Sequence, residues 1–284
     1  MSRDTSVHHE SSSHLSQLDA AMGDVMIAAA QAGGEVILRA HKKRKPGTVA
    51  ASTAKGANDF VTEADREAES RIISVIKEVY PEHDIQAEES APQPFRSDYR
   101  WIIDPLDGTT NFIHGYPMFA VSIGLSYKGV MRMGVVFDPL RSELFRAESG
   151  RGAFLNDKPI HLSEVRQLTD ALLLTGFPFK AQQHLHKYLG IFEELFKASS
   201  GIRRAGSAAL DMAYVACGRA DGFFEMVLSP WDMAAGAVLI VEAGGAVTDF
   251  TGAPDFMDSG HVVAGHPTVL EQMLPRIARH FPLW

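Results

Sequence analysis

The chain has 284 residues, a single cysteine, and 27 Lys+Arg against 35 Asp+Glu, which gives a formal net charge of -8 at pH 7. With 45% hydrophobic and 22% charged residues, the composition is typical of a globular protein with a large core. The lone Cys217 excludes an internal disulfide and cysteine-rich zinc sites, and the acidic balance disfavours direct nucleic-acid binding.

The N-terminal region, residues 1–16, is rich in Ser and His, lacks hydrophobic periodicity and is expected to be a disordered tail. It has no apolar segment like that of a secretory signal, and no apolar run reaches the roughly 20 residues of a membrane span. We therefore expect a cytoplasmic protein without a membrane segment. From Leu15 onward, apolar residues recur at helical spacing, which predicts a helix ending in the basic run 41–45.

A polar linker is expected over residues 47–58, followed by a second helix over residues 62–80. Thr62 and Asp65 form the T-x-x-D pattern of an N-terminal capping box, so capping is the simplest local role for Asp65. After this helix, Glu88 and Glu89 follow the apolar Ile85. By itself this acidic pair is typical of a solvated loop.

The segment WIIDPLDGTTNF, residues 101–112, places two carboxylates at the end of a predicted buried strand. Pro105 disfavours a helical conformation at Asp104, and Gly108 permits a sharp turn. Asp104 and Asp107 would then lie on one turn and offer the oxygen ligands that Mg²⁺ prefers, with the Thr109 hydroxyl beside them to orient a bound water. An Asx-type turn explains the same fragment without a metal.

The remaining pattern begins with an antiparallel hairpin over residues 119–127 and 130–137 and further strands at 144–147 and 152–155. Helices are expected at 185–196, 207–218, 233–243 and 269–280, with strands at 172–174, 222–225, 247 and 262–263. Asp232 precedes the helix from Met233, where it would serve as an N-cap. The order predicts an α+β fold with an N-terminal lobe, 17–165, and a C-terminal α/β lobe, 166–284.

Together these motifs resemble the inositol monophosphatase family. Residues 101–112 are similar to its first signature, and SPWDMAAG over 229–236, followed by EAGG over 242–245, is similar to its second. The segments NDFVTEAD over 58–65 and EES over 88–90 match the family's other acidic positions. The similarity runs from about residue 18 to about residue 275 and is greatest to the bacterial SuhB-type branch.

The resemblance implies a layered αβαβα sandwich, a homodimer, and Mg²⁺-dependent hydrolysis of small phosphate monoesters with two or three ions, sensitive to Li⁺. The substrate expected first is myo-inositol monophosphate, which would be hydrolysed to inositol and phosphate. Carried over by position, the metal ligands would be Glu88, Asp104 and the Leu106 carbonyl for one ion, Asp104, Asp107 and Asp232 for a second, and Glu88 near Asp65 for a third. Four carboxylates in one cleft repel one another, so cations would compensate their charge and activate a bound water.

The resemblance also assigns the substrate contacts. Glu88 and Thr109 would position the attacking water, and the Gly108 and Thr109 amides would meet the phosphate. The alcohol part would face Asp107, Ala208, Glu225 and Asp232. The helix predicted near Ser207 would add free N–H groups at its start, although ordinary Ser capping explains the same residues.

Two alternatives remain open. Fructose 1,6-bisphosphate is the nearest other substrate, alone or as a second activity, although Glu225 favours a neutral polyol because a carboxylate would repel a second phosphate. A nucleotide 3′-phosphatase is disfavoured, because no aromatic or basic adenine pocket is evident. The second alternative is a contact with the transcription machinery, as in SuhB-type relatives, for which Arg203, Arg204 and the run 41–45 are candidates unless they are plain surface charge.

Overall fold

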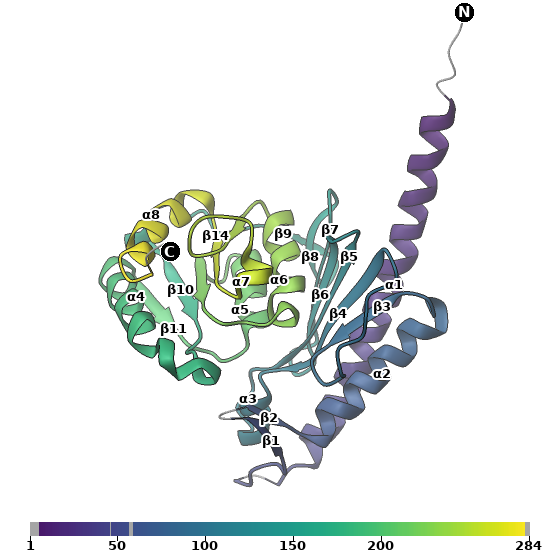
Figure 1. Cartoon of the computed structure of the whole chain (residues 1–284), viewed down its shortest axis with the longest axis horizontal. Helices are drawn as coiled ribbons and strands as arrows, with labels where there is room; N and C mark the ends of the chain where they lie inside the picture. The colour runs from purple at the N-terminus through teal and green to yellow at the C-terminus, as the bar shows by residue number, and fades with distance from the viewer. Residues whose placement is uncertain (1–5, 46, 57–58, 282–284) are drawn as a thin grey trace, which may run out of the picture.

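The computed structural model describes residues 6–45, 47–56 and 59–281, which fold into five layers (Figure 1). The first layer is α1 and α2, and the second is a seven-stranded sheet in the order β3-β4-β5-β6-β7-β8-β9. Helices α5 and α6 form the middle layer. A five-stranded sheet in the order β11-β10-β12-β14-β13 follows, and α4 and α8 cover its outer face. The αβαβα sandwich predicted from the sequence is confirmed.

The N-terminal elements are α1 (Ser6–Lys43), β1 (Thr53–Gly56), β2 (Asp59–Val61), α2 (Glu63–Val79), β3 (Asp84–Ala87), β4 (Tyr99–Asp107), α3 (Thr109–His114), β5 (Ala120–Tyr127), β6 (Val130–Asp138), β7 (Glu143–Glu148), β8 (Gly152–Leu155) and β9 (Lys158–Ile160). The C-terminal elements are β10 (Leu172–Thr175), α4 (Leu185–Ala198), β11 (Gly201–Arg203), α5 (Ala208–Ala216), β12 (Gly222–Glu225), α6 (Pro230–Glu242), β13 (Ala246–Thr248), α7 (Phe256–Ser259), β14 (Val262–Gly265) and α8 (Pro267–Ala278). Short 3₁₀ turns cover Leu168–Asp170 and Phe179–His184.

The middle layer joins the two sheets in one apolar core. Buried residues of α5 and α6 pack between Val136 and Phe145 of the first sheet and Phe223 and Val262 of the second. Helix α6 lies close against β6 because that strand presents Gly134, where an added Cβ would lie 2.5 Å from the Ala235 carbonyl oxygen. This close approach brings the first turn of α6 beside the end of β4.

Helix α1 begins at Ser6, so the prediction of a disordered tail is wrong for residues 6–16, while residues 1–5 lie outside the described residues. The chain has no Gly or Pro between Ser6 and Met22, and extending an existing helix needs no new nucleus. Figure 1 shows this N-terminal part of α1 running beyond the sheet.

The C-terminal part of α1, Ala21–Lys43, is apolar and long enough to cross a bilayer by length and composition alone. In the fold it serves as a core helix. Its inner face carries Met26, Ala30 and Ile37, which are buried against α2 and the seven-stranded sheet. Of its most apolar 18-residue stretch, 44% is buried inside the protein. Its hydrophobicity is therefore used in packing.

Two local predictions need correction, and one short helix was not expected. The linker expected over 47–58 contains β1, which pairs with β2 as a small antiparallel hairpin. The short helix α3 follows Gly108, whose φ of 93° a residue with a side chain rarely adopts. Helix α6 begins at Pro230 rather than Met233, so Asp232 lies inside its first turn and Ser229 is the N-cap. Pro at the first helical position was the missed signal.

Candidate active site

A cleft of about 340 Å³ lies where the two sheets meet at the middle helices. Its walls come from chain segments far apart in sequence: the end of β4, the segment after β10, the start of α5, the end of β12 and the start of α6. It contains Glu88, Asp104, Asp107, Glu225 and Asp232 together, as the sequence analysis expected.

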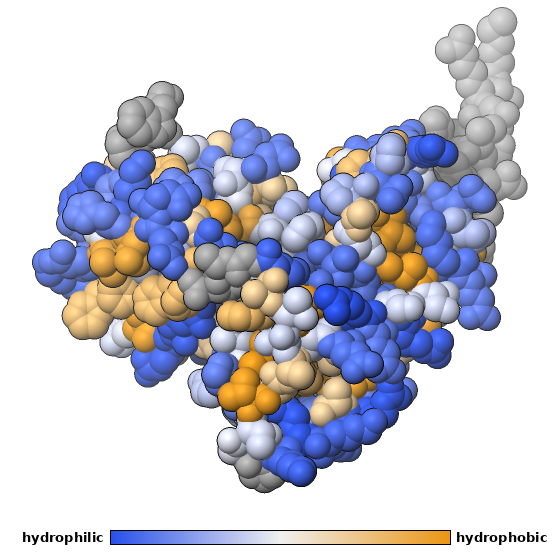
Figure 2. Space-filling model, turned by 60° about the horizontal axis from the view of Figure 1, so that its bottom comes forward, coloured by the Kyte–Doolittle hydropathy of each residue, from blue (hydrophilic) through white to orange (hydrophobic). Residues whose placement is uncertain are grey.

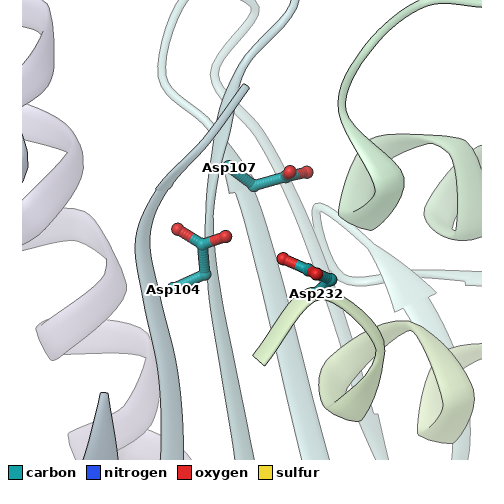
Figure 3. A group of neighbouring side chains, drawn as sticks. All are labelled: Asp104, Asp107 and Asp232. Carbon is teal, nitrogen blue, oxygen red and sulfur yellow. The ribbon is translucent and has the colours of Figure 1, made fainter. Parts of the chain in front are cut away.

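Three aspartates gather in this cleft. Asp104 and Asp107 come from the end of β4, and Asp232 comes from the first turn of α6. One carboxylate oxygen of each lies within 4.8 Å of the others, and Figure 3 shows the three side chains directed into one space. The spacing of Asp104 and Asp107 was readable locally, whereas the approach of Asp232 depends on the packing of α6.

Hydrogen bonds from backbone amides fix the direction of each aspartate. The Leu106 amide donates to Asp104 Oδ1 at 2.9 Å, and the Ala209 amide donates to Asp107 Oδ2 at 2.8 Å. The Ser229 amide donates to Asp232 Oδ2 at 2.7 Å, completing a capping box at the start of α6. Each carboxylate keeps its other oxygen for a ligand, so the local structure leaves a set of aimed oxygen donors.

The start of α5 donates hydrogen bonds to Asp107. Ser207 is the N-cap of this helix, and its hydroxyl donates to Asp107 Oδ2 beside the Ala209 amide. The Ala208 amide also faces this carboxylate, while Ala208 itself lines the cleft. The N–H groups at the start of α5 were expected to face the substrate. Some of them instead bind Asp107, a proposed metal ligand.

Without a cation, all three aspartates have pKa values above that of an ordinary aspartate, by different amounts. Burial, with the nearby Glu88, Asp107 and Asp232 charges, holds the pKa of Asp104 well above its ordinary value. Burial and the Asp107 charge raise the pKa of Asp232 to about 8. Burial also raises the pKa of Asp107 to about 6, although its hydrogen bonds oppose the shift. A nearby positive charge would lower these pKa values and allow all three carboxylates to be ionised together.

Glu88 stands beside the aspartates with two cations near it. Lys55 Nζ of β1 lies 3.0 Å from Glu88 Oε1 and 2.7 Å from Glu89 Oε1, and Lys180 Nζ lies 3.8 Å from Glu88 Oε1. Burial alone would lower the pKa of Lys55, but the two glutamates outweigh it and raise that pKa. Neither lysine was assigned a role from the sequence, because their contacts depend on the fold.

Asp65 makes the predicted capping contact and a second contact that the sequence did not indicate. Its Oδ2 accepts from the Thr62 amide and hydroxyl in the predicted capping box of α2. Its Oδ1 lies 3.0 Å from Thr109 Oγ1, which is also 3.1 Å from the Leu106 carbonyl oxygen. The Thr109 hydroxyl can donate its proton to either acceptor, and its lone pairs could then accept from a water bound in the cleft that Thr109 lines.

Glu69 was missed by the sequence analysis. Its carboxylate accepts from the Glu89 amide at 2.8 Å and from the Ser90 hydroxyl, and so fixes the loop that carries Glu88. The signal was available, because Asp65 and Glu69 lie at helical spacing with the buried Ile72 and Ile76. Acidic residues on the apolar stripe of a helix indicate a buried polar partner.

The other end of the cleft is built around Glu225, at the end of β12. Its carboxyl is pressed against Gly176, where an added Cβ would lie 1.9 Å from Glu225 Oε1. Burial raises the pKa of Glu225 to about 8, and Arg204 opposes that shift. The Arg204 guanidinium lies 5.1 Å from the Phe179 ring centroid and also lines the cleft. The sequence alone showed no aromatic or basic adenine pocket, whereas the fold places one aromatic and one basic side chain together on this wall of the cleft.

The donor set suits a hard divalent cation. Every candidate ligand is an oxygen, from the carboxylates and the Leu106 carbonyl, which is the chemistry that Mg²⁺ selects. The raised aspartate pKa values show that the bare cluster lacks the positive charge such an ion would bring. No sulfur or imidazole ligand takes part in the three-aspartate group found among residues 6–45, 47–56 and 59–281.

Comparisons with known proteins agree with this geometry. A model described as the inositol monophosphatase family matches residues 19–282. The chain is 48% identical to the Nus factor SuhB of Pseudomonas aeruginosa over 92% of this chain and 97% of that protein. Among solved structures, suhB of Bartonella henselae has a TM-score of 0.86 at 40% identity, covering 90% and 98% of the two chains. The inositol monophosphatase of Anabaena has a TM-score of 0.82 at 38% identity, covering 92% and 96%.

Proposed function

The chain belongs to the inositol monophosphatase family, and on this premise we propose that it is a Mg²⁺-dependent phosphatase that hydrolyses myo-inositol monophosphate to inositol and phosphate. The observation that carries the proposal is the group of Asp104, Asp107 and Asp232, two buried carboxylates and one partly buried, aimed into one cleft. Bound ions would supply a nucleophilic water at neutral pH and compensate the charge on the leaving oxygen.

The chain's own residues have separate parts in this proposal. Glu88, Asp104, Asp107, Asp232 and the Leu106 carbonyl would hold two or three ions. Asp104, shared between two of them, would fix their spacing. The third ion would lie at Glu88, near Asp65.

Positioning of the reactants falls to a second group of residues. Thr109, held by Asp65, and Glu88 would orient the attacking water. The Gly108 and Thr109 amides would hold phosphate oxygens, because Gly108 turns the backbone toward the cleft with a φ of 93°. Glu225 would accept from the polyol hydroxyls, with Asp107, Ala208 and Asp232 on the same wall.

A specific observation keeps a sugar bisphosphate as the second candidate substrate. Arg204 and Lys180 line the same cleft and could neutralise a second phosphate, whereas Glu225 would repel it while ionised. The two effects oppose each other at neighbouring positions. Substrate preference should therefore depend on the charge of residue 225.

The test is phosphate release from inositol 1-phosphate and from fructose 1,6-bisphosphate as Mg²⁺ is titrated from zero, with wild type and Glu225→Gln side by side. We expect Mg²⁺-dependent release from inositol 1-phosphate by the wild type, and inhibition when Li⁺ is added. Above the pKa of about 8 that burial gives Glu225, where the wild-type carboxyl is ionised, Glu225→Gln should shift the preference toward the bisphosphate by about tenfold, the effect of roughly one hydrogen bond or ion contact.

Glu193→Gln is a matched control, because this glutamate is exposed on α4 and pairs with Lys197. This variant should release phosphate from both substrates at the wild-type rates. No release from either substrate at any Mg²⁺ concentration would refute the phosphatase, and an unchanged preference in Glu225→Gln would refute the role of that residue.

We also propose a homodimer. Helix α4 exposes Leu185, Leu189 and Phe196 by 43%, 48% and 61%, one apolar stripe at helical spacing. Figure 2 shows hydrophobic patches on the side of the molecule that carries the C-terminal sheet and its helices. Leu189→Asp should lower the sedimentation coefficient from the value of a dimer to that of a monomer. Val130→Asp, at an exposed position of the β5–β6 hairpin, is the control and should remain a dimer. A wild-type monomer at micromolar concentration would contradict the proposal.

The identity to proteins named Nus factor favours a second role that uses the surface rather than the cleft. We propose that the chain contacts the transcription machinery from a cytoplasmic location, with Arg203 as an exposed candidate at the edge strand β11. The basic run at the end of α1 is partly occupied within the fold, because His41 packs on the Phe119 ring and Arg44 donates to the Thr48 carbonyl.

A further inference from the structure

The loop from residue 226 to residue 229 connects the two ends of the cleft. It leaves β12 directly after Glu225 and enters α6 at Pro230, two residues before Asp232. All four of its residues line the cavity. Its backbone conformation therefore sets the separation between the substrate end of the site and a proposed metal ligand.

Val227 in this loop has a φ of 62°. This left-handed region is unfavourable for a β-branched residue, whose side chain crowds the following carbonyl. The other non-glycine residues with positive φ in the described part of the chain lie in hairpin turns of the seven-stranded sheet. Because such a conformation persists only where its surroundings impose it, contacts outside the loop must hold Val227.

Those contacts come from the segment between α7 and β14. The Val227 amide donates to Nδ1 of His261 at 3.3 Å, and the Leu228 amide donates to the Gly260 carbonyl oxygen at 2.8 Å. Gly260 approaches so closely that an added Cβ would lie 2.6 Å from the Leu228 carbonyl oxygen. Two consecutive peptide groups of the loop are thus held by two consecutive residues of the neighbouring segment.

The His261 ring is itself fixed in place. It stacks on Phe250 with centroids 5.3 Å apart and meets Phe281 edge to face at 4.8 Å. To accept from the Val227 amide, Nδ1 must carry a lone pair, so the ring is the neutral tautomer with its proton on Nε2. Protonation of Nδ1 would remove the acceptor and place two N–H groups face to face.

We propose that His261 is a positioning residue for the active site, which holds Val227 in its left-handed conformation and thereby keeps Glu225 and Asp232 in register across the cleft. The proposal rests on the proposed phosphatase only for its kinetic consequence. The contact between His261 and the loop is a property of the fold and can be measured without any substrate.

The surroundings of His261 give this contact a pH dependence. Burial lowers the pKa of His261, and His184 and Lys187 lower it further, while Asp249 opposes them. The neutral ring therefore predominates at pH 7 and above, and the acceptor is lost as the pH falls through the lowered pKa. The loop should accordingly be held at neutral pH and released in acid.

The first test is amide hydrogen exchange of the peptide containing residues 226–229, in the full chain without substrate. His261→Leu should speed exchange of the Val227 amide by about tenfold, the factor expected for one lost hydrogen bond. His261→Asn, whose side-chain oxygen can replace Nδ1 as acceptor, should stay near wild type. His161→Leu, at an exposed position outside the cavity lining, is the control. Unchanged exchange in His261→Leu would overturn the proposal.

The second test separates positioning from general destabilisation. With inositol 1-phosphate and saturating Mg²⁺, His261→Leu should raise KM by about tenfold with a smaller change in kcat. Adding Val227→Gly, which makes the left-handed conformation easy, should return KM toward wild type. Failure of this rescue would overturn the proposal.

A pH series covers the case in which His261→Leu does not fold. After correction for intrinsic exchange rates, exchange of the wild-type loop should speed up as the pH is lowered stepwise from 7 through the lowered pKa of His261, and His261→Asn should show no such rise. A wild-type loop that stays equally protected over the whole acid range in which the protein remains folded would contradict the mechanism. If no phosphatase activity were found, the exchange experiments would still decide whether His261 holds the loop.

Discussion

Asp104→Asn is expected to lower kcat/KM for inositol 1-phosphate by roughly a thousandfold or more, because it removes a charge shared by two proposed ions. The amide has nearly the same shape, and its oxygen can still accept from the Leu106 amide, so the fold should remain. The metal-free variant should unfold at a higher temperature than the wild type. The reason is that burial and neighbouring carboxylates hold the Asp104 pKa far above its ordinary value, so an ionised Asp104 opposes folding.

The measurement combines steady-state kinetics, calorimetric Mg²⁺ binding and thermal unfolding in chelator. Asp138→Asn is the matched control, since Asp138 is fully buried but pairs with Arg141 away from the cleft. It should lose stability and keep kcat/KM, the opposite pattern to Asp104→Asn. Near-normal turnover by Asp104→Asn would exclude Asp104 as a shared ligand. Retained binding to a transcription partner by this variant would show that the surface role is independent of the chemistry.

The metal-free protein is expected to lose stability as the pH rises from about 5 to about 9. Burial raises the pKa of Glu225 from 4.5 to about 8 and that of Asp232 from 3.8 to about 8. Between the ordinary and the raised values, the folded state binds protons that the unfolded chain releases, so a rise in pH favours unfolding. At about 1.36 kcal/mol per pKa unit, Glu225 alone could account for roughly 3–5 kcal/mol of the free energy of unfolding.

Urea unfolding at pH 5, 7 and 9 in chelator measures this slope. Glu225→Gln should flatten it in part, because the amide does not titrate. Saturating Mg²⁺ should also flatten it, since the cation stabilises the ionised carboxylates of the folded state. Constant stability across the range, or a gain at high pH, would show that these carboxyls are not protonated in the metal-free fold.

Structural elements that depend on short sequence patterns could be predicted from the sequence. The capping box of Thr62 and Asp65 involves only four consecutive residues, and the hairpin of β5 and β6 depends on the two-residue turn that begins at Lys128. Both could therefore be predicted from the sequence. Asp104 and Asp107 were likewise placed by Pro105 and Gly108. In each case, the determining interactions lie within a few residues of one another.

Contacts between distant elements could not be predicted in this way. Lys55 reaches Glu88 only because β1 lies against the loop after β3, and Arg204 reaches Phe179 only through the packing of the second sheet. Nothing in the sequence fixes the relative rotation of these elements. The family resemblance brought Asp232 and Glu225 to the site, but it gave no information about the residues that position the site from behind. Glu69 holds the loop that carries Glu88, and His261 holds the loop between Glu225 and Asp232.

Two helix starts of this protein also supply an acidic side chain to the site. In both α2 and α6 the third helical residue is an aspartate that closes a capping box: Asp232 lines the cleft, and Asp65 contacts Thr109, which lines it. A substitution at either position would thus disturb helix initiation and chemistry together, which leaves little freedom for evolutionary drift there. New substrate preferences in this scaffold would have to arise instead at the wall around Glu225, Arg204 and Phe179, where no helix start depends on the side chain.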